Sequence, residues 1–232
     1  MYLYKLLSLG LSYPEGKNWV VIERLLSIAD SLCNGELLDQ IKSFGKCFAE
    51  RKQRINDMES EYLRIFDIGG KISPYETEYL TEKISRKPFE LADIAGFYNA
   101  FGFGINEDND NKESVDHISV ELEFMAILAW KEEYARENQQ EENLRIVQDA
   151  RMKFLKEHLA RWGFFFRRRI REFECDDFYK GLGEILESLL NLECEKHGLN
   201  ARLFRKEIST EPYNGIRDEE LTCGQMFSAA DD

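Results

Sequence analysis

The chain has 232 residues, of which 43% are hydrophobic and 12% are aromatic, and these fractions exclude an intrinsically disordered protein. Its formal net charge of −13 disfavours non-specific binding to nucleic acids, whose phosphates require a basic surface. The five cysteines are scattered without a CxxC pair, so zinc ligation is not indicated and reduced thiols are expected.

The N-terminus lacks the basic region, apolar core and cleavage site of a signal peptide. No uncharged run reaches the roughly 20 apolar residues of a membrane span. The longest such run covers residues 94–106 and contains three glycines. We therefore expect a cytoplasmic protein without stable membrane insertion.

Apolar residues at helical spacing predict helices through the first half of the chain. The first covers residues 2–11, and the second covers 20–32 and ends at Asn34-Gly35. A long helix is expected over 36–66, where Gly45 is a candidate bend, and another over 89–101.

A loop that opens with glycines separates the last two of these helices. Within it, Ser73 is placed to cap a helix whose first residue is Pro74, and Glu76 lies three residues after Ser73, as in a capping box. Capping accounts for Ser73 and Glu76 locally, but it gives Tyr75 no role.

Residues 106–113 are polar and mostly acidic or amide, a composition typical of a solvated linker or hinge. The stretch 116–130 follows. Its apolar residues lie all round a helical wheel, which predicts a central buried helix with Asp116 capping its start. Later helices are expected over 144–173 and 178–192.

The fold class predicted is all-α, a single bundle of about seven to nine helices with a hinge loop between its N- and C-terminal halves. One domain is expected over residues 1–198, with the hinge at about 104–115. Residues 199–232 form a C-terminal extension of unknown role that holds Cys223 and a short helix candidate at 201–208. Arginines at 167–169 and 171 are expected to form a solvated helix end.

Catalytic signatures are missing: there is no phosphate-binding glycine loop, no HExxH helix and no GxSxG elbow. His117, Glu121 and Glu123 are a weak candidate for a metal-dependent helical enzyme, because metal centres normally use more histidine than three dispersed residues provide. We expect no enzyme, no metal and no cofactor.

Aromatic and acidic residues stand instead at two junctions between loop and helix, Pro74-Tyr75-Glu76 and Asp116-His117. Binding sites are commonly built at such junctions. An acidic groove with aromatic walls suits an extended peptide that carries arginines and apolar side chains.

Short motifs along the chain carry a resemblance to one known family. They are Tyr4-Lys5-Leu6-Leu7 with Tyr13-Pro14, Glu61-Tyr62-Leu63-Arg64-Ile65-Phe66, Ser73-Pro74-Tyr75-Glu76-Thr77, Ala92-Asp93 with Phe101-Gly102-Phe103, Asp116-His117-Ile118 with Glu121-Leu122-Glu123-Phe124-Met125, and Phe154, His158-Leu159, Trp162 and Phe178-Tyr179. On these residues, from about 1 to 195, the chain resembles the TorD/DmsD family of redox-enzyme maturation chaperones.

Two positions depart from the family pattern. The Glu-Pro-x-Asp-His hinge appears here with Ser114 in place of proline, which is expected to loosen the hinge. The aromatic residue after the loop proline, often tryptophan in the family, is Tyr75.

The resemblance implies a cytoplasmic chaperone of a molybdopterin-containing redox enzyme that binds the precursor and its twin-arginine leader, assists cofactor insertion and takes part in export quality control. It places signal-peptide binding at Pro74, Tyr75, Glu76, Asp116 and His117, and Glu121 shares a helix face with His117. We expect the carboxylates of Glu76 and Asp116 to pair with the two arginines. His117 either makes this contact sensitive to pH or holds Asp116 in place.

No nucleic-acid partner is expected, and the protein is a monomer or a dimer. The alternative is a helical scaffold or regulator with another protein client.

Overall fold

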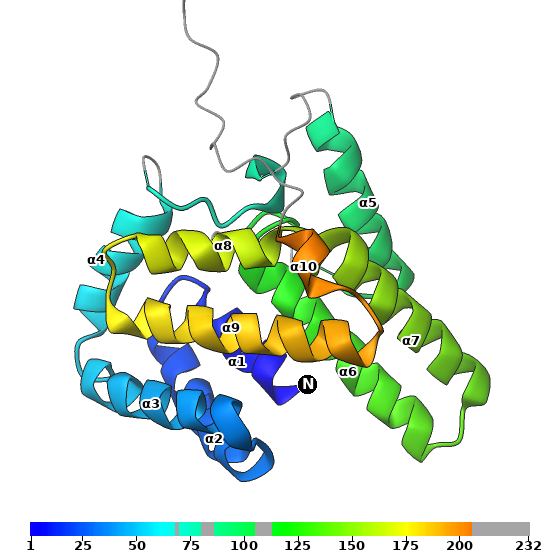
Figure 1. The fold of residues 1–232 in the computed structure, drawn as a ribbon, viewed down its shortest axis with the longest axis horizontal. Helices are drawn as coiled ribbons and strands as arrows, with labels where there is room; N and C mark the ends of the chain where they lie inside the picture. The colour runs from blue at the N-terminus through cyan, green and yellow to red at the C-terminus, as the bar shows by residue number, and fades with distance from the viewer. Residues whose placement is uncertain (68–69, 80–85, 105–112, 206–232) are drawn as a thin grey trace, which may run out of the picture.

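The computed structural model describes residues 1–67, 70–79, 86–104 and 113–205, and these residues form helices without a β-sheet (Figure 1). The predicted all-α fold is therefore confirmed. The helices are α1 (Tyr2–Gly10), α2 (Gly16–Leu32), α3 (Gly35–Arg51), α4 (Ile55–Phe66), α5 (Lys87–Ala100), α6 (Ile118–Glu137), α7 (Glu141–Phe154), α8 (Ala160–Glu172), α9 (Asp177–Lys196) and α10 (Ala201–Phe204).

Helix α1 is the inner element of the bundle and packs against α2, α6 and α9. Its leucines Leu6 and Leu7 have no exposed surface. Helix α9 runs between α8 and α3 in Figure 1 and packs against both. The approach of α1 to α9 requires glycine, because a Cβ atom at Gly10 would lie 2.8 Å from a methyl group of Leu182.

Helix α6 confirms the predicted central helix. Ile118, Leu122 and Met125 are fully buried, and Ala129 is 7% exposed. Trp130, the last residue of the predicted stretch, is about half exposed.

Residues 36–66 form two helices, so the prediction of one long helix is wrong. Helices α3 and α4 are separated at residues 52–54, whereas Gly45 lies inside α3. Arg51, the last residue of α3, donates to Asp176 at 2.9 Å, and Asp176 also caps the start of α9. The break between the two helices thus comes directly after a residue that forms a tertiary ion pair. No proline or glycine marks this break in the sequence.

Residues 144–173 also differ from the single helix predicted. Helix α7 ends at Phe154, a π-helical turn covers Leu155–Leu159, and α8 begins at Ala160. The chain changes direction between α7 and α8 in Figure 1. Because π turns are usually single insertions in an α-helix and often lie at functional sites, the residues of this turn are considered below.

Most of the predicted hinge at about 104–115, namely 105–112, lies outside the described residues, as do residues 206–232 with Cys223. The described cysteines, Cys33, Cys47, Cys175 and Cys194, are free thiols. Among the described helices, none has the length and apolar character that a membrane crossing requires.

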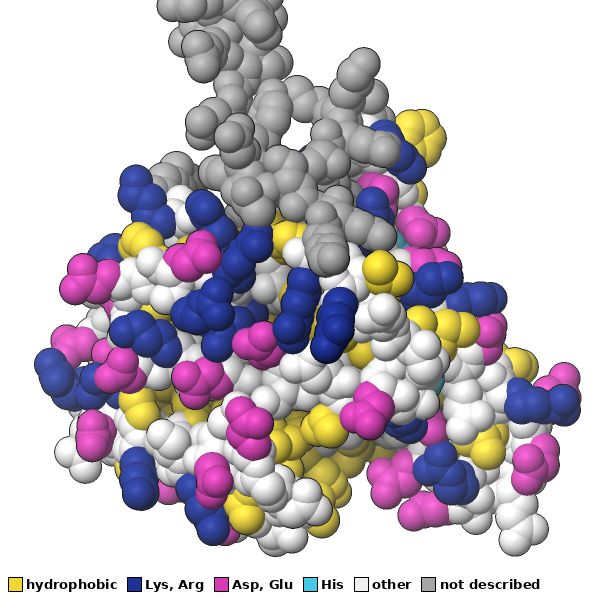
Figure 2. All heavy atoms as spheres, in the orientation of Figure 1, with side chains coloured by type: hydrophobic (Ala, Val, Ile, Leu, Met, Phe, Trp, Pro, Cys, Tyr) yellow, Lys and Arg dark blue, Asp and Glu magenta, His cyan; other side chains and the backbone are white. Residues whose placement is uncertain are grey.

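The arginine run near the end of α8 is held by neighbouring groups. Arg167 pairs with Glu187 at 2.7 Å, and the guanidinium of Arg168 lies 4.8 Å from the ring centre of Phe165. Arg169 donates to the carbonyl of Lys71 at 3.3 Å. Figure 2 shows Lys and Arg side chains gathered on this face, where α8 crosses it. Most of the run is therefore engaged with the fold, which the expectation of a solvated helix end did not include.

A buried ion network joins α6, α7 and α9. Arg151 donates to Glu132 at 2.6 Å and to Glu193 at 2.7 Å. Burial disfavours the charged form of Glu132, but hydrogen bonds from Arg151 and Gln148 outweigh it and lower the pKa of Glu132 to about 2. A depressed carboxyl pKa stabilises the folded chain at neutral pH.

We expect Glu132→Gln to destabilise the protein at pH 7 and to have little effect near pH 2. The pKa of Glu132 falls from an ordinary value of 4.5 to about 2 on folding. Its stabilising contribution is therefore complete above the unfolded pKa and is lost as the pH falls through the folded one. Urea unfolding of the native chain and of Glu132→Gln between pH 7 and pH 2 measures the difference in their free energy of unfolding. The control is Glu133→Gln, which changes the exposed neighbouring glutamate. A loss of stability in Glu132→Gln that stays constant with pH would contradict this account.

Candidate functional site

Two loops far apart in the sequence meet in a junction formed by residues 73–79 and 113–118. The amide of Glu76 donates to the carbonyl of Asp116 at 2.9 Å, and the amide of Ile118 donates to the carbonyl of Pro74 at 2.8 Å. These bonds flank an antiparallel bridge between Tyr75 and His117. The two motifs singled out in the sequence are therefore joined directly through their backbones.

The capping box predicted at Ser73 and Glu76 is not formed. Ser73 Oγ accepts from the amide of Tyr75 at 3.3 Å, but a 3₁₀ turn, Glu76–Glu78, follows in place of an α-helix starting at Pro74. The Glu76 side chain is fully buried and lies 3.1 Å from Nδ1 of His158. A partner from another helix has replaced the local one.

Asp116 caps this 3₁₀ turn and not the helix that follows it. Its Oδ2 accepts from the hydroxyl of Thr77 at 2.6 Å and from the amide of Thr77 at 3.3 Å. The hydroxyl of Ser114 donates to Oδ1 at 2.5 Å. Ser114, which stands where the related family has proline, thus makes a side-chain hydrogen bond that proline could not make.

His117 is the N-cap of α6. Its Nδ1 accepts from the amide of Ser119 at 3.2 Å, and its Nε2 lies 3.3 Å from the hydroxyl of Tyr62. Burial lowers the pKa of His117 to about 4, so the ring is neutral at pH 7. Because Nδ1 is an acceptor, the proton lies on Nε2 and points to Tyr62. A pH-sensitive role near neutrality is thereby disfavoured.

Glu121 lies one turn into α6 and has no exposed surface. The indole N–H of Trp162 donates to its Oε2 at 3.1 Å. Burial, followed by the charge of Glu76, raises the pKa of Glu121 well above its ordinary value, which favours the protonated carboxyl.

His158 is the main residue that sequence reasoning missed. It lies in the π-helical turn and faces Glu76, although it is not among the predicted site residues. Burial disfavours its imidazolium, but the hydrogen bond and the charge of Glu76 outweigh this and raise the pKa of His158. The sequence signal for it is the His158-Leu159 motif of the resemblance.

An open cavity of about 650 Å³ adjoins the junction. It is lined by Tyr75, Glu78, Lys87, Leu91, Glu113, Ser114, Val115 and Asp116. The Tyr75 ring packs edge-on against His117 with centroids 5.3 Å apart, and its hydroxyl donates to Glu113 at 3.4 Å. Lys87 is paired with Glu78 at 2.8 Å, so the carboxylates of Glu113 and Asp116 leave the cavity acidic.

The structure brings all six predicted site residues into one region, but it buries five of them. Tyr75 is partly exposed, whereas the others are buried: Pro74, Glu76, Asp116, His117 and Glu121. Burial and internal hydrogen bonds leave the carboxylates of Glu76 and Asp116 little freedom to meet a peptide. Glu113 and Leu91, which the prediction did not include, lie on the accessible wall.

The metal-binding alternative at His117, Glu121 and Glu123 is not supported. Glu123 forms an ion pair with Lys5 on α1, and the other two side chains are bonded to Ser119 and Trp162. The three side chains therefore have separate partners.

Glu121→Gln is expected to leave the free energy of unfolding nearly unchanged. Glutamine resembles a protonated glutamate and keeps an oxygen for the Trp162 N–H. Glu121→Leu leaves that donor without an acceptor, which costs about 1–3 kcal/mol. Denaturant unfolding of both variants tests the ionisation state. Equal and large losses would show that Glu121 carries a charge that the fold requires.

Comparisons with known proteins agree on one family. The model of the nitrate reductase delta subunit matches residues 30–167, more than half of the chain. The chlorate reductase assembly chaperone protein of Ideonella dechloratans is 34% identical over 137 residues, which cover 56% of this chain and 67% of the relative. The selenate reductase assembly chaperone protein of Thauera selenatis has the same identity and coverage.

A third relative matches over more of the chain. The perchlorate reductase assembly chaperone protein of Dechloromonas aromatica (strain RCB) is 24% identical over 209 residues, 84% of this chain and 88% of the relative. No solved structure matches significantly. The resemblance to redox-enzyme maturation chaperones is confirmed, and the chain belongs to the nitrate reductase delta subunit family.

Proposed function

We propose that this chain is a non-catalytic cytoplasmic chaperone of a molybdenum-type oxidoreductase. It binds the precursor and its twin-arginine leader, and it holds the enzyme until its cofactor is inserted. The observation that carries this proposal is that three relatives, from three organisms, are each named as the assembly chaperone of a reductase.

The cavity beside Tyr75 is the proposed contact surface for the leader. Leu91 and Val115 offer apolar surface, and Glu113 offers carboxylate oxygens, whereas those of Asp116 already accept from Thr77 and Ser114. An arginine can take two parallel hydrogen bonds to such a carboxylate and can stack on an aromatic ring. Glu113 is the better partner, because its side chain is about one-third exposed whereas Asp116 is 1% exposed.

The buried residues of the predicted site have a positioning role in this proposal. Pro74, Asp116 and His117 hold Tyr75 through the bridge and its flanking hydrogen bonds. Glu76 anchors the same loop to His158, and Glu121 fastens the first turn of α6 to Trp162. Tyr75 and Glu113 then make the direct contacts.

The test is affinity capture of the tagged protein from its own host, with the captured proteins identified by mass spectrometry. The native chain is compared with a Tyr75→Ala/Glu113→Gln double variant. A matched control, Tyr134→Ala/Glu133→Gln, changes the same residue types on the exposed end of α6. We expect the native chain and the control to recover a reductase precursor, and the double variant to lose at least 90% of it.

Peptide binding supplies the second measurement. Affinity for a synthetic twin-arginine leader should fall as salt rises, since exposed charges are screened. It should also fall when both arginines are lysines, which lack the planar fork. Recovery of the precursor by the double variant would move the site elsewhere, and recovery of no precursor from a host that expresses one would favour a scaffold with another client.

A further inference from the structure

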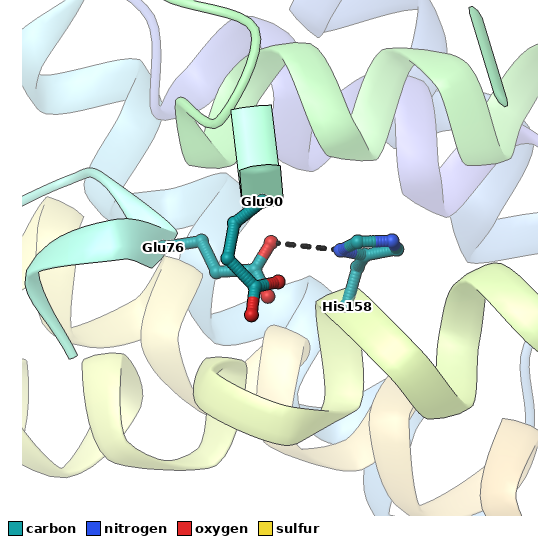
Figure 3. A group of neighbouring side chains, drawn as sticks. All are labelled: Glu76, Glu90 and His158. Carbon is teal, nitrogen blue, oxygen red and sulfur yellow. Dashed lines mark hydrogen bonds and ion pairs between the residues drawn. The ribbon is translucent and has the colours of Figure 1, made fainter. Parts of the chain in front are cut away.

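Three side chains that could bind a metal ion lie close together in the interior, next to the junction. Glu76 comes from the 3₁₀ turn, Glu90 from α5 and His158 from the π-helical turn, and their side chains point toward one another in Figure 3. One ligand atom from each lies within 4.8 Å of the others. Glu76 and His158 are buried and Glu90 is half-buried.

Two of these buried side chains keep polar atoms without a hydrogen bond. Within the described part of the chain, Oε1 of Glu76 has only the buried carboxyl of Glu121 beside it, and Nε2 of His158 has only the carboxylate of Asp93 at 3.4 Å, outside hydrogen-bond geometry. Buried polar groups in native proteins are nearly always paired, and an exception calls for a water, an ion or a functional reason. Glu76 is 0% exposed and His158 is 1% exposed, so bulk solvent does not satisfy these atoms.

The orientation of His158 suits coordination through Nδ1. Its Nε2 lies 3.4 Å from Oδ2 of Asp93, one helical turn after Glu90 on α5. Histidines that bind metals commonly have a carboxylate beside the second ring nitrogen, which fixes the ring and the tautomer. With Nε2 turned to Asp93, Nδ1 faces the interior of the cluster and donates to Glu76, and a metal ion would take the place of this proton.

The separation between His158 and Glu76 suits a small metal ion, and the ligand atom of Glu90 lies within 4.8 Å of both. Zinc bonds to nitrogen and oxygen of about 2.0–2.1 Å place tetrahedral ligand atoms roughly 3.4 Å apart. His158 Nδ1 and Glu76 Oε2 are 3.1 Å apart, so shifts of a few tenths of an ångström would admit an ion in place of the proton between them.

The charges around the cluster also favour a cation. Glu76 and Glu90 contribute two carboxylates, and a third, Asp93, stands at the surface. Glu76 lies beside His158, and Glu90 lies 3.4 Å from Arg161, which is itself 38% exposed. A buried divalent ion would compensate the carboxylates more directly than this exposed arginine does.

We propose that Glu76, Glu90 and His158 bind a divalent transition-metal ion such as Zn²⁺. The mixed imidazole and carboxylate donors suit zinc and its neighbours in the first row. The ion fastens the 3₁₀ turn to α5 and to the π-helical turn. Tyr75 and Leu91 stand next to Glu76 and Glu90 in the chain and line the cavity, so metal binding fixes the walls of the proposed leader site.

The full chain, reduced and freed of metal, is titrated with Zn²⁺ in a calorimeter. We expect one saturable site, with affinity at least ten-fold weaker in Glu90→Gln. This variant leaves the Glu76 and His158 pair in place, and circular dichroism checks its fold. The control is Glu157→Gln, an exposed glutamate in the same π-helical turn, which should bind like the native chain.

Because thiols also bind zinc, Co²⁺ is used as a spectroscopic substitute. Thiolate ligands give Co²⁺ an intense near-ultraviolet charge-transfer band, which imidazole and carboxylate ligands do not. A thiolate band, equal zinc affinity in Glu90→Gln, or no saturable site in the native chain would each overturn the proposal. Precursor capture is measured without added metal, so it stands or falls independently of this result.

Discussion

The structure of the site depends on a short backbone pairing between two loops that lie about 40 residues apart. The hydrogen bonds on either side of the Tyr75–His117 bridge join the first half of the chain to the start of α6. A buried backbone group that is left unpaired costs free energy, because it has lost its hydrogen bonds to water. The pairing is therefore favoured once the loops meet. The side chains of the junction then form hydrogen bonds with the remaining donors and acceptors of the two loops.

This pairing divides the polar residues into two kinds. The first kind accepts hydrogen bonds from backbone or side-chain donors inside the protein and is not available to a partner: Asp116, His117 and Glu121. Tyr75 and Glu113 are left at the cavity wall, where a partner can reach them. A family motif can therefore mark a binding site although most of its residues never touch the ligand, because the motif specifies the shape on which the exposed residues stand.

The sequence predicted the helices well wherever apolar residues recur at helical spacing, as in α1, α6 and α9, and it located the two motifs that meet. It missed the interruptions at residues 52–54 and 155–159, which neither glycine nor proline marks. It also assigned Glu76 to a local capping box, whereas the partner is His158, 82 residues away. Local rules cannot anticipate such a pair, because its energy comes from two side chains that share a buried space only after folding.

The π-helical turn makes the spacing between α7 and α8 a property of the fold. A π turn holds one residue more than an α-helical turn, and such turns bend a helix. Deleting one residue within Leu155–Leu159 would therefore restore ordinary helical geometry and remove the bend between α7 and α8. Helix α8 would then leave its present direction, and Trp162 and Phe166, now fully buried, would lose their places in the core. The length of the chain in this segment is thus restrained by the fold, and insertions and deletions would be tolerated far better in the polar connection before α7.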